Sequence, residues 1–192
     1  MEILKHINWI DIVLVILLFR GGYIAVIRGF HIEIFKFCGT VLAVFASLHY
    51  YSALSLFLQK KSFGVGQYTD LFNLAAFLSL AFGAYGVFVL LRVLFCRFIK
   101  IEAVPDLDKW GGFVFGIGKS FLFLSLLVFT LAVTNISYFK GSIKSSYLSG
   151  RIFMIAPKLY TWTWSNFGSK FISEGGVNAS VFELQEGIFK EK

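Results

Sequence analysis

The chain has 192 residues, of which 57% are hydrophobic, 19% aromatic and only 15% charged. A soluble domain is about 45–50% apolar and about 25% charged, and a globule of this size needs a polar coat that this composition cannot supply. The sequence therefore excludes a free soluble enzyme and a disordered chain, and it favours a protein surrounded by lipid. The net charge of +7 does not indicate a nucleic-acid partner, because the basic residues stand at the ends of apolar runs without a recognition motif.

Four apolar runs are long enough to cross a bilayer, which takes about 20 residues for about 30 Å of hydrocarbon. The first run, Ile7–Ile27, contains Asp11 and Arg20. No small-x-small cleavage site follows it, so we interpret it as a retained helix and not as a signal peptide. The other three windows contain no Asp, Glu, Lys or Arg: Phe37–Leu58, Leu71–Leu91 and Ser120–Phe139. We predict an all-α integral membrane bundle, with residues 1–139 as a four-helix transmembrane domain whose spans cover about 7–27, 35–58, 71–95 and 111–139.

The connections agree with four helices. Arg28-Gly29 predicts a tight turn between the first two, because glycine accepts positive φ. The polar, glycine-bearing stretch 59–67 predicts a second loop, and the charged stretch 97–109 predicts a third. We expect Asp106 or Asp108 to cap the fourth helix.

Small residues recur every fourth position in each span. Such residues stay close to one helical face and let helix backbones approach closely in lipid. We therefore predict helix packing through Gly29, Gly39, Gly83, Gly112 and Gly116, either within one chain or between copies. The four series are Gly21, Ala25, Gly29; Gly39, Ala43, Ser47; Ala75, Ser79, Gly83; and Gly112, Gly116, Ser120.

The tail, residues 140–192, has a different pattern. Its aromatic residues Tyr160, Trp164, Phe167 and Phe171 follow one another at helical spacing and form a stripe on one face. We interpret about 156–172 as an amphipathic helix on the membrane surface, with this stripe at the interface. The alternative is a small core that packs against the end of the bundle.

Ionisable groups in or beside the spans are costly and point to a role in structure or function. We single out Asp11, Arg28, Glu33, Asp108 and Lys119. Asp11 lies near a helix start, where the helix dipole favours a carboxylate, and Arg28 and Glu33 flank the first turn. Lys119 lies deeper in its span, so we expect it to pair with Asp11 or Glu33, to snorkel, or to take part in transport.

Catalytic constellations are absent from the sequence. It contains no HExxH, GxSxG, Walker or CxxC motif. The three histidines lie in separate segments without ligand spacing, and both cysteines fall in apolar runs. We therefore predict no catalytic residue, no metal site and no cofactor.

The order of several short motifs resembles the colicin V production protein (CvpA) family of bacterial inner-membrane proteins. The resemblance covers about residues 8–140. It departs from the family at Asp108-Lys109 and Lys119-Ser120, where members often carry arginine, so that bidentate guanidinium bonding is lost. The motifs are Asn8-Trp9-Ile10-Asp11, Ile27-Arg28-Gly29-Phe30 with Glu33, His49-Tyr50-Tyr51, and Leu107-Asp108-Lys109 with Gly112 and Phe115-Gly116.

The resemblance implies a four-span inner-membrane protein needed for toxin production or export, with ties to envelope homeostasis and no established catalytic activity. We expect a non-enzymatic factor whose partners are the lipid bilayer and either further copies of itself or other membrane proteins. The alternative is a small transporter or channel subunit in which Asp11, Glu33 and Lys119 line a polar path. The balance of basic residues slightly favours loops 1 and 3 in the cytoplasm.

Overall fold

Four long helices form the body of the molecule. The computed structural model describes residues 8–61, 68–98, 105–171 and 176–189, and these residues are almost entirely helical, without a strand among them. The long helices are α1 (Trp9–Arg28), α2 (Phe30–Lys61), α3 (Thr69–Phe98) and α4 (Pro105–Val133). Each contains a stretch long and apolar enough to cross a membrane, so the predicted all-α membrane bundle is confirmed.

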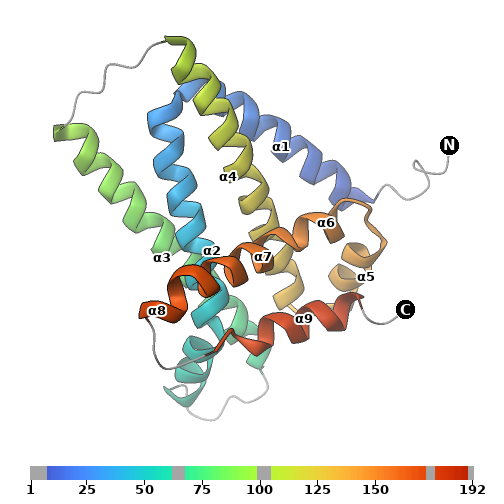
Figure 1. Cartoon of the computed structure of the whole chain (residues 1–192). Coiled ribbons are helices and arrows are strands. Elements are labelled where there is room, and N and C mark those ends of the chain that lie inside the picture. Colours follow the sequence, from blue (N-terminus) through green and yellow to red (C-terminus); the bar gives the residue numbers. More distant parts are fainter. Residues whose placement is uncertain (1–7, 62–67, 99–104, 172–175, 190–192) are drawn as a thin grey trace.

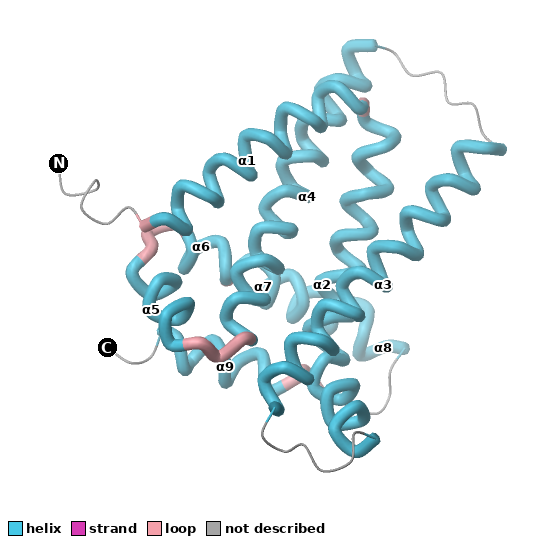
Figure 2. The backbone as a smooth tube through the Cα atoms, turned by 180° about the vertical axis from the view of Figure 1, so that it is seen from behind, coloured by secondary structure: helices cyan, strands magenta, loops and turns pink. Residues whose placement is uncertain are grey.

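The helices do not pack in chain order. α1 packs on α4, α4 on α2, and α2 on α3, whereas α1 touches α2 only slightly. The same arrangement is visible from behind, where α1 and α3 lie on opposite sides of the α2–α4 pair (Figure 2). α3 is the most exposed of the four, because it packs chiefly against α2 and leaves large apolar side chains such as Phe82 and Leu90 uncovered. These side chains suit a lipid environment.

The helix ends differ from the predicted boundaries. α4 begins at Pro105, a residue suited to the first turn of a helix, and ends at Val133, earlier than the predicted 139. Asn135 follows with a φ of 58°, a conformation that a helix interior does not allow. The apolar run Ser120–Phe139 therefore breaks here, and its last residues belong to α5 (Ser137–Ser145).

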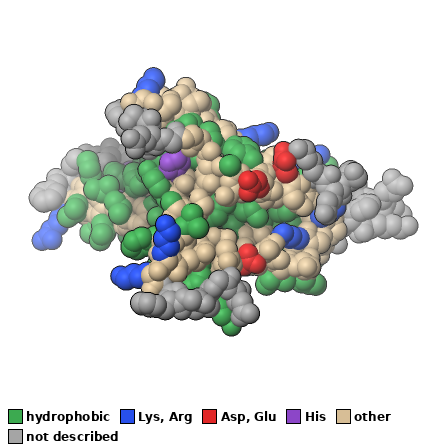
Figure 3. Space-filling view, turned by 90° about the horizontal axis from the view of Figure 1, so that it is seen from below, with side chains coloured by type: hydrophobic (Ala, Val, Ile, Leu, Met, Phe, Trp, Pro, Cys, Tyr) green, Lys and Arg blue, Asp and Glu red, His purple; other side chains and the backbone are tan. Residues whose placement is uncertain are grey.

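The tail folds back against one end of the bundle. It consists of α5, α6 (Ser149–Phe153), α7 (Ile155–Thr163), a π-helical turn at Trp164–Gly168, α8 (Ser169–Phe171) and α9 (Ala179–Phe189). Figure 1 shows α6 to α8 crossing in front of the long helices, with α5 and α9 below them. Seen from below, this end carries basic and acidic side chains interspersed, without one dominant charged patch (Figure 3).

An aromatic cluster joins the tail to the bundle. Phe129 of α4 stacks on Phe77 of α3, with ring centroids 5.3 Å apart, and on Phe153 of α6 at 5.4 Å. Tyr51 of α2 meets Phe77 edge-on at 6.0 Å. All four rings are buried. Each such side chain contributes a large apolar area, and the four rings belong to the hydrophobic core that joins the bundle to the tail.

Candidate functional site: intramembrane charges and the clasps between segments

The turn between α1 and α2 is held by a carboxylate from α4. Gly29 closes α1 with a φ of 81°, and Asp108 accepts hydrogen bonds from the Phe30 backbone N–H at 2.8 Å and from His31 Nδ1 at 3.1 Å. The first N–H groups of a helix lack partners within that helix and favour a negative charge. Asp108 therefore caps α2 across the bundle.

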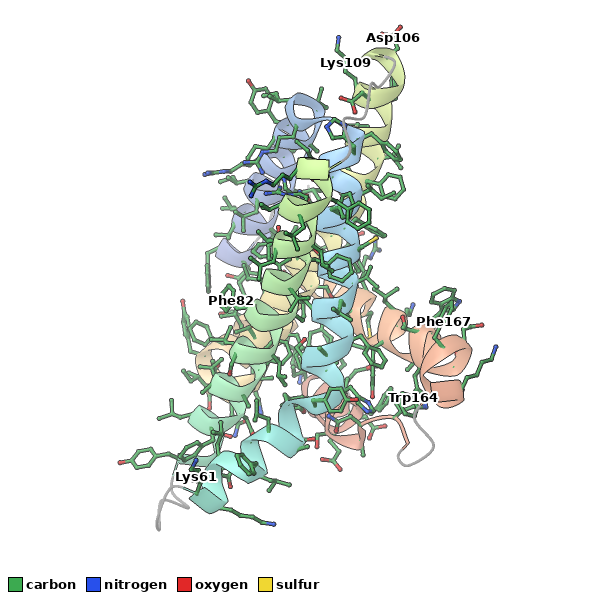
Figure 4. All side chains as sticks on the ribbon, turned by 90° about the vertical axis from the view of Figure 1, so that its left-hand side faces the viewer. Lys61, Phe82, Asp106, Lys109, Trp164 and Phe167 are labelled. Atoms are coloured by element: carbon green, nitrogen blue, oxygen red, sulfur yellow. The ribbon has the colours of Figure 1, made fainter. Side chains whose placement is uncertain are left out.

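This position corrects the prediction that Asp106 or Asp108 caps the fourth helix. Both residues lie inside the first turn of α4, which starts at Pro105. Figure 4 shows Asp106 and Lys109 at this end of the molecule, with Lys61 at the opposite end. Arg28 is exposed beside the turn, as expected for a residue that can reach lipid headgroups.

Glu33 is the centre of a buried charge cluster. Its side chain is fully buried, and it accepts from Lys36 Nζ at 2.6 Å and from Lys119 of α4. Of the two partners expected for Lys119, the structure thus gives Glu33. Removing one member of such a buried pair costs about 3–5 kcal/mol, because the remaining charge loses its partner.

Three pairs of small residues bring α1 and α4 together. Gly21 lies against Ser120, Ala25 against Gly116, and Gly29 against Gly112. A Cβ at Gly112 would come within 2.9 Å of the Ala25 carbonyl oxygen, which is closer than real Cβ contacts allow. The two predicted series are therefore complementary faces of one antiparallel interface within the chain.

The other two packing glycines differ from each other. Gly39 of α2 lies against α3, where an added Cβ would approach Phe88 Cβ to 2.8 Å. Gly83 has no atom within 4 Å of the place its Cβ would take, and Ala75 and Ser79 beside it are exposed. Gly83 therefore packs against no other helix within the described chain, because this face of α3 points outward, and for Gly83 packing between copies stays a prediction.

Asp11 is hydrogen-bonded to the tail. It does not pair with Lys119, which binds Glu33. One Asp11 oxygen accepts from Ser146 Oγ at 2.6 Å and from the Leu148 N–H at 2.9 Å, and the other accepts from the Asn8 N–H at 2.9 Å. Asn8 in turn caps α1 and donates to the Ser142 carbonyl at 3.0 Å. We call this set the Asp11 clasp. The sequence indicated a helix-start role for Asp11 but contained no signal for its tail partners.

The aromatic stripe of the tail is divided between two environments. Tyr160 and Trp164 are buried, and Trp164 stacks on His49 of α2 with ring centroids 4.8 Å apart. Phe167 alone is shown exposed, and it points away from the bundle (Figure 4). The prediction that Tyr160 and Trp164 are interfacial is therefore wrong, since they pack as the alternative small core. The side chain of Phe171 lies outside the described part of the structure.

Sequence reasoning also missed two polar links between tail and bundle. Tyr160 Oη lies 2.8 Å from His49 Nδ1 and accepts from the Asn178 N–H at 2.9 Å, and Asn178 donates to the Leu48 carbonyl. Ser125 of α4, fully buried, accepts from the Ala156 N–H at 2.8 Å where α6 meets α7. Single serines, histidines and asparagines are too common for such links to be recognised from spacing.

The arrangement is suited to holding segments together. Each of Asp11, Glu33 and Asp108 bonds groups from a second segment, and no set of three or more potential metal ligands occurs within the described ranges. Among the described residues, neither Asp11 nor Asp108 is hydrogen-bonded to a member of the Glu33 cluster, so the three carboxylates form separate contacts.

Comparison with known proteins agrees with this organisation. A family model described as "Colicin V production protein" matches residues 10–157. No curated protein and no solved structure gives a significant match. The matched region includes Asp11 with its tail partners Ser146 and Leu148, the Asp108 cap and the Glu33 cluster; it begins two residues after Asn8 and ends within α7. That family is not known as an enzyme family. The family match and the four helices of membrane-spanning length together identify the chain as a membrane protein. The chain belongs to the colicin V production protein family.

Proposed function

We propose that this chain is a non-enzymatic scaffold of the bacterial inner membrane, which supports toxin production or export or the maintenance of the envelope. The observation that carries the proposal is that the fully buried carboxylate of Glu33 pairs with two lysines, Lys36 of its own helix and Lys119 of α4. A buried charge whose partners lie on two helices stabilises the contact between those helices, which is a structural role. Family membership supports the link to toxin production.

A scaffold needs partners, and the proposal names the lipid bilayer together with either further copies of the chain or other membrane proteins. The outward apolar face of α3, which includes Phe82 and Leu90, supports the first of these. We further propose that the chain through α4 forms the membrane domain and that the tail begins with α5 (Ser137–Ser145), slightly before the predicted boundary at residue 140. The turns after α1 and α3 would lie in the cytoplasm. Labelling a single cysteine in the tail of intact cells tests this orientation, after Cys38 and Cys96 have been replaced.

The decisive experiment separates function from abundance. Lys119→Met should reduce toxin export and the amount of protein in the membrane in the same proportion, because it weakens the α2–α4 contact. A transport role would instead abolish export while the amount of protein stays normal, and that result would overturn the proposal. Lys109→Met, an exposed site on the same helix, is the matched control and should leave both quantities unchanged.

A further inference from the structure

A groove between α1 and α4 combines apolar walls with two cations. Its volume is about 180 Å³, and its lining includes Arg20, Gly21 and Ile24 of α1 and Lys119, Ser120 and Phe123 of α4. We call it the Arg20 groove. It opens between the helices whose small residues lie in contact, at the level of the Gly21–Ser120 pair.

Arg20 lies deep in its span. It stands eight residues before Arg28 at the end of α1, which is about 12 Å along the helix axis at 1.5 Å per residue. Its side chain is exposed on the surface of the described chain, and therefore faces lipid. An arginine at such a depth requires an anion or water, since an isolated charge in hydrocarbon is costly.

No carboxylate of the described residues is bonded to Arg20. The Glu33 carboxylate, which pairs with the other cation of the groove, is already shared between Lys36 and Lys119. Lys36 and Lys119 thus share one negative charge, and Lys119 lines the same groove as Arg20, so that two positive charges meet there. The Ser120 hydroxyl donates to the Gly116 carbonyl and does not supply a further charge.

From this charge balance we infer that the Arg20 groove binds the phosphate of an anionic phospholipid from the surrounding membrane. The guanidinium offers several N–H donors in a planar fork that matches phosphate, and the ammonium of Lys119 retains donors beyond the one given to Glu33. Ile24 and Phe123 supply apolar walls for the adjoining acyl chain. The bound headgroup would supply the negative charge that the described chain lacks here.

The test uses the purified full-length protein in a neutral detergent. Phosphatidylglycerol and phosphatidylcholine are added at equal concentration, and the lipid that stays bound is measured by native mass spectrometry. We expect the wild-type chain to prefer phosphatidylglycerol by about tenfold, the size of effect expected for a charge-assisted hydrogen bond. Arg20→Gln should abolish the preference. Because Arg20 is exposed, this variant should fold, which its elution profile checks.

Arg28→Gln is the matched control. It removes the same charge from the same helix, but outside the groove, and should keep the preference. Equal retention of the two lipids by the wild-type chain would overturn the inference, as would an equal loss in both variants, because binding would then follow net charge. Displacement of phosphatidylglycerol by equimolar oleate would also overturn it, by assigning the groove to a carboxylate.

Discussion

Ala25 of α1 lies so close to Gly116 of α4 that a Cβ built on Gly116 would overlap the Cβ of Ala25. Within a bilayer, where hydrophobic attraction between helices is weak, contacts of this kind supply much of the packing energy. We therefore expect Gly116→Leu to separate α1 from α4 and to lower the amount of protein recovered in the membrane several-fold.

Gly83→Leu tests whether this effect is specific to the interface. The same substitution on α3 meets open space and should leave the recovery at the wild-type level. Quantitative immunoblotting of washed membranes measures both variants. Equal recovery of Gly116→Leu and the wild-type chain would contradict the packing described for α1 and α4.

The Glu33 cluster predicts an order of severity among single substitutions. Glu33→Gln leaves both Lys36 and Lys119 without a counter-charge, whereas Lys119→Met leaves the pair of Glu33 with Lys36 intact. Glu33→Gln should therefore lower the free energy of unfolding by about 3–5 kcal/mol relative to the wild type, and Lys119→Met should lower it by less. Thermal unfolding in detergent gives the order, and a lower midpoint for Lys119→Met than for Glu33→Gln would contradict it.

The Asp11 clasp predicts a local effect on the tail. Asp11→Ala removes the acceptor of the Ser146 hydroxyl and of the Leu148 N–H. Each hydrogen bond to a charged group contributes about 1.5–3 kcal/mol, so the segment 142–149 should exchange its amide hydrogens faster. Hydrogen–deuterium exchange measures this, with the exposed Asp106→Ala as control. Unchanged exchange in 142–149 would contradict the role given to the Asp11 clasp in holding this segment.

The Tyr160 hydroxyl predicts a second, separate effect. Tyr160→Phe removes the group that contacts His49 and accepts from the Asn178 N–H, so residues 176–189 should be protected less, by about 1 kcal/mol. The exposed Tyr147→Phe is the control. Loss of protection in both variants would argue against the contact, because the two substitutions remove the same atom.

The same hydroxyl has a predictable dependence on pH. Burial raises the pKa of Tyr160 above its ordinary value of 10.0, so the hydroxyl keeps its proton at neutral pH. A raised pKa in the folded state means that the stabilisation is complete below the unfolded value and is lost as the pH rises above it. The exchange difference between wild-type and Tyr160→Phe chains should therefore be constant from pH 6 to about 9.

The long helices could be predicted because apolar runs of bilayer length allow few alternatives. The packing of the small residues was predictable as a tendency, but its geometry was not. The series in α1 and α4 are complementary, whereas the series ending at Gly83 points outward. Spacing identifies a face that permits close approach, and only the three-dimensional arrangement determines whether another helix occupies it.

The tail shows a second limit of sequence reasoning. An aromatic stripe buries the same area against lipid and against protein, so Tyr160 and Trp164 fit a membrane surface and a core equally well by pattern. Asp108 shows a third limit: a carboxylate near a helix start suggests a cap for that helix, yet Asp108 bonds the start of α2. Partners distant in sequence cannot be inferred from spacing alone.

The pairing of α1 with α4 has a consequence for biosynthesis. The ribosome adds Gly29 about 80 residues before Gly112. At about 5–20 residues per second, several seconds pass before the face of α4 that packs on α1 has been synthesised. During that interval the glycine-rich face of α1 has no helix to pack against, because the next helix, α2, scarcely touches α1. Nascent chains must therefore be sheltered by the insertion machinery, or diffuse laterally, until translation delivers the fourth span.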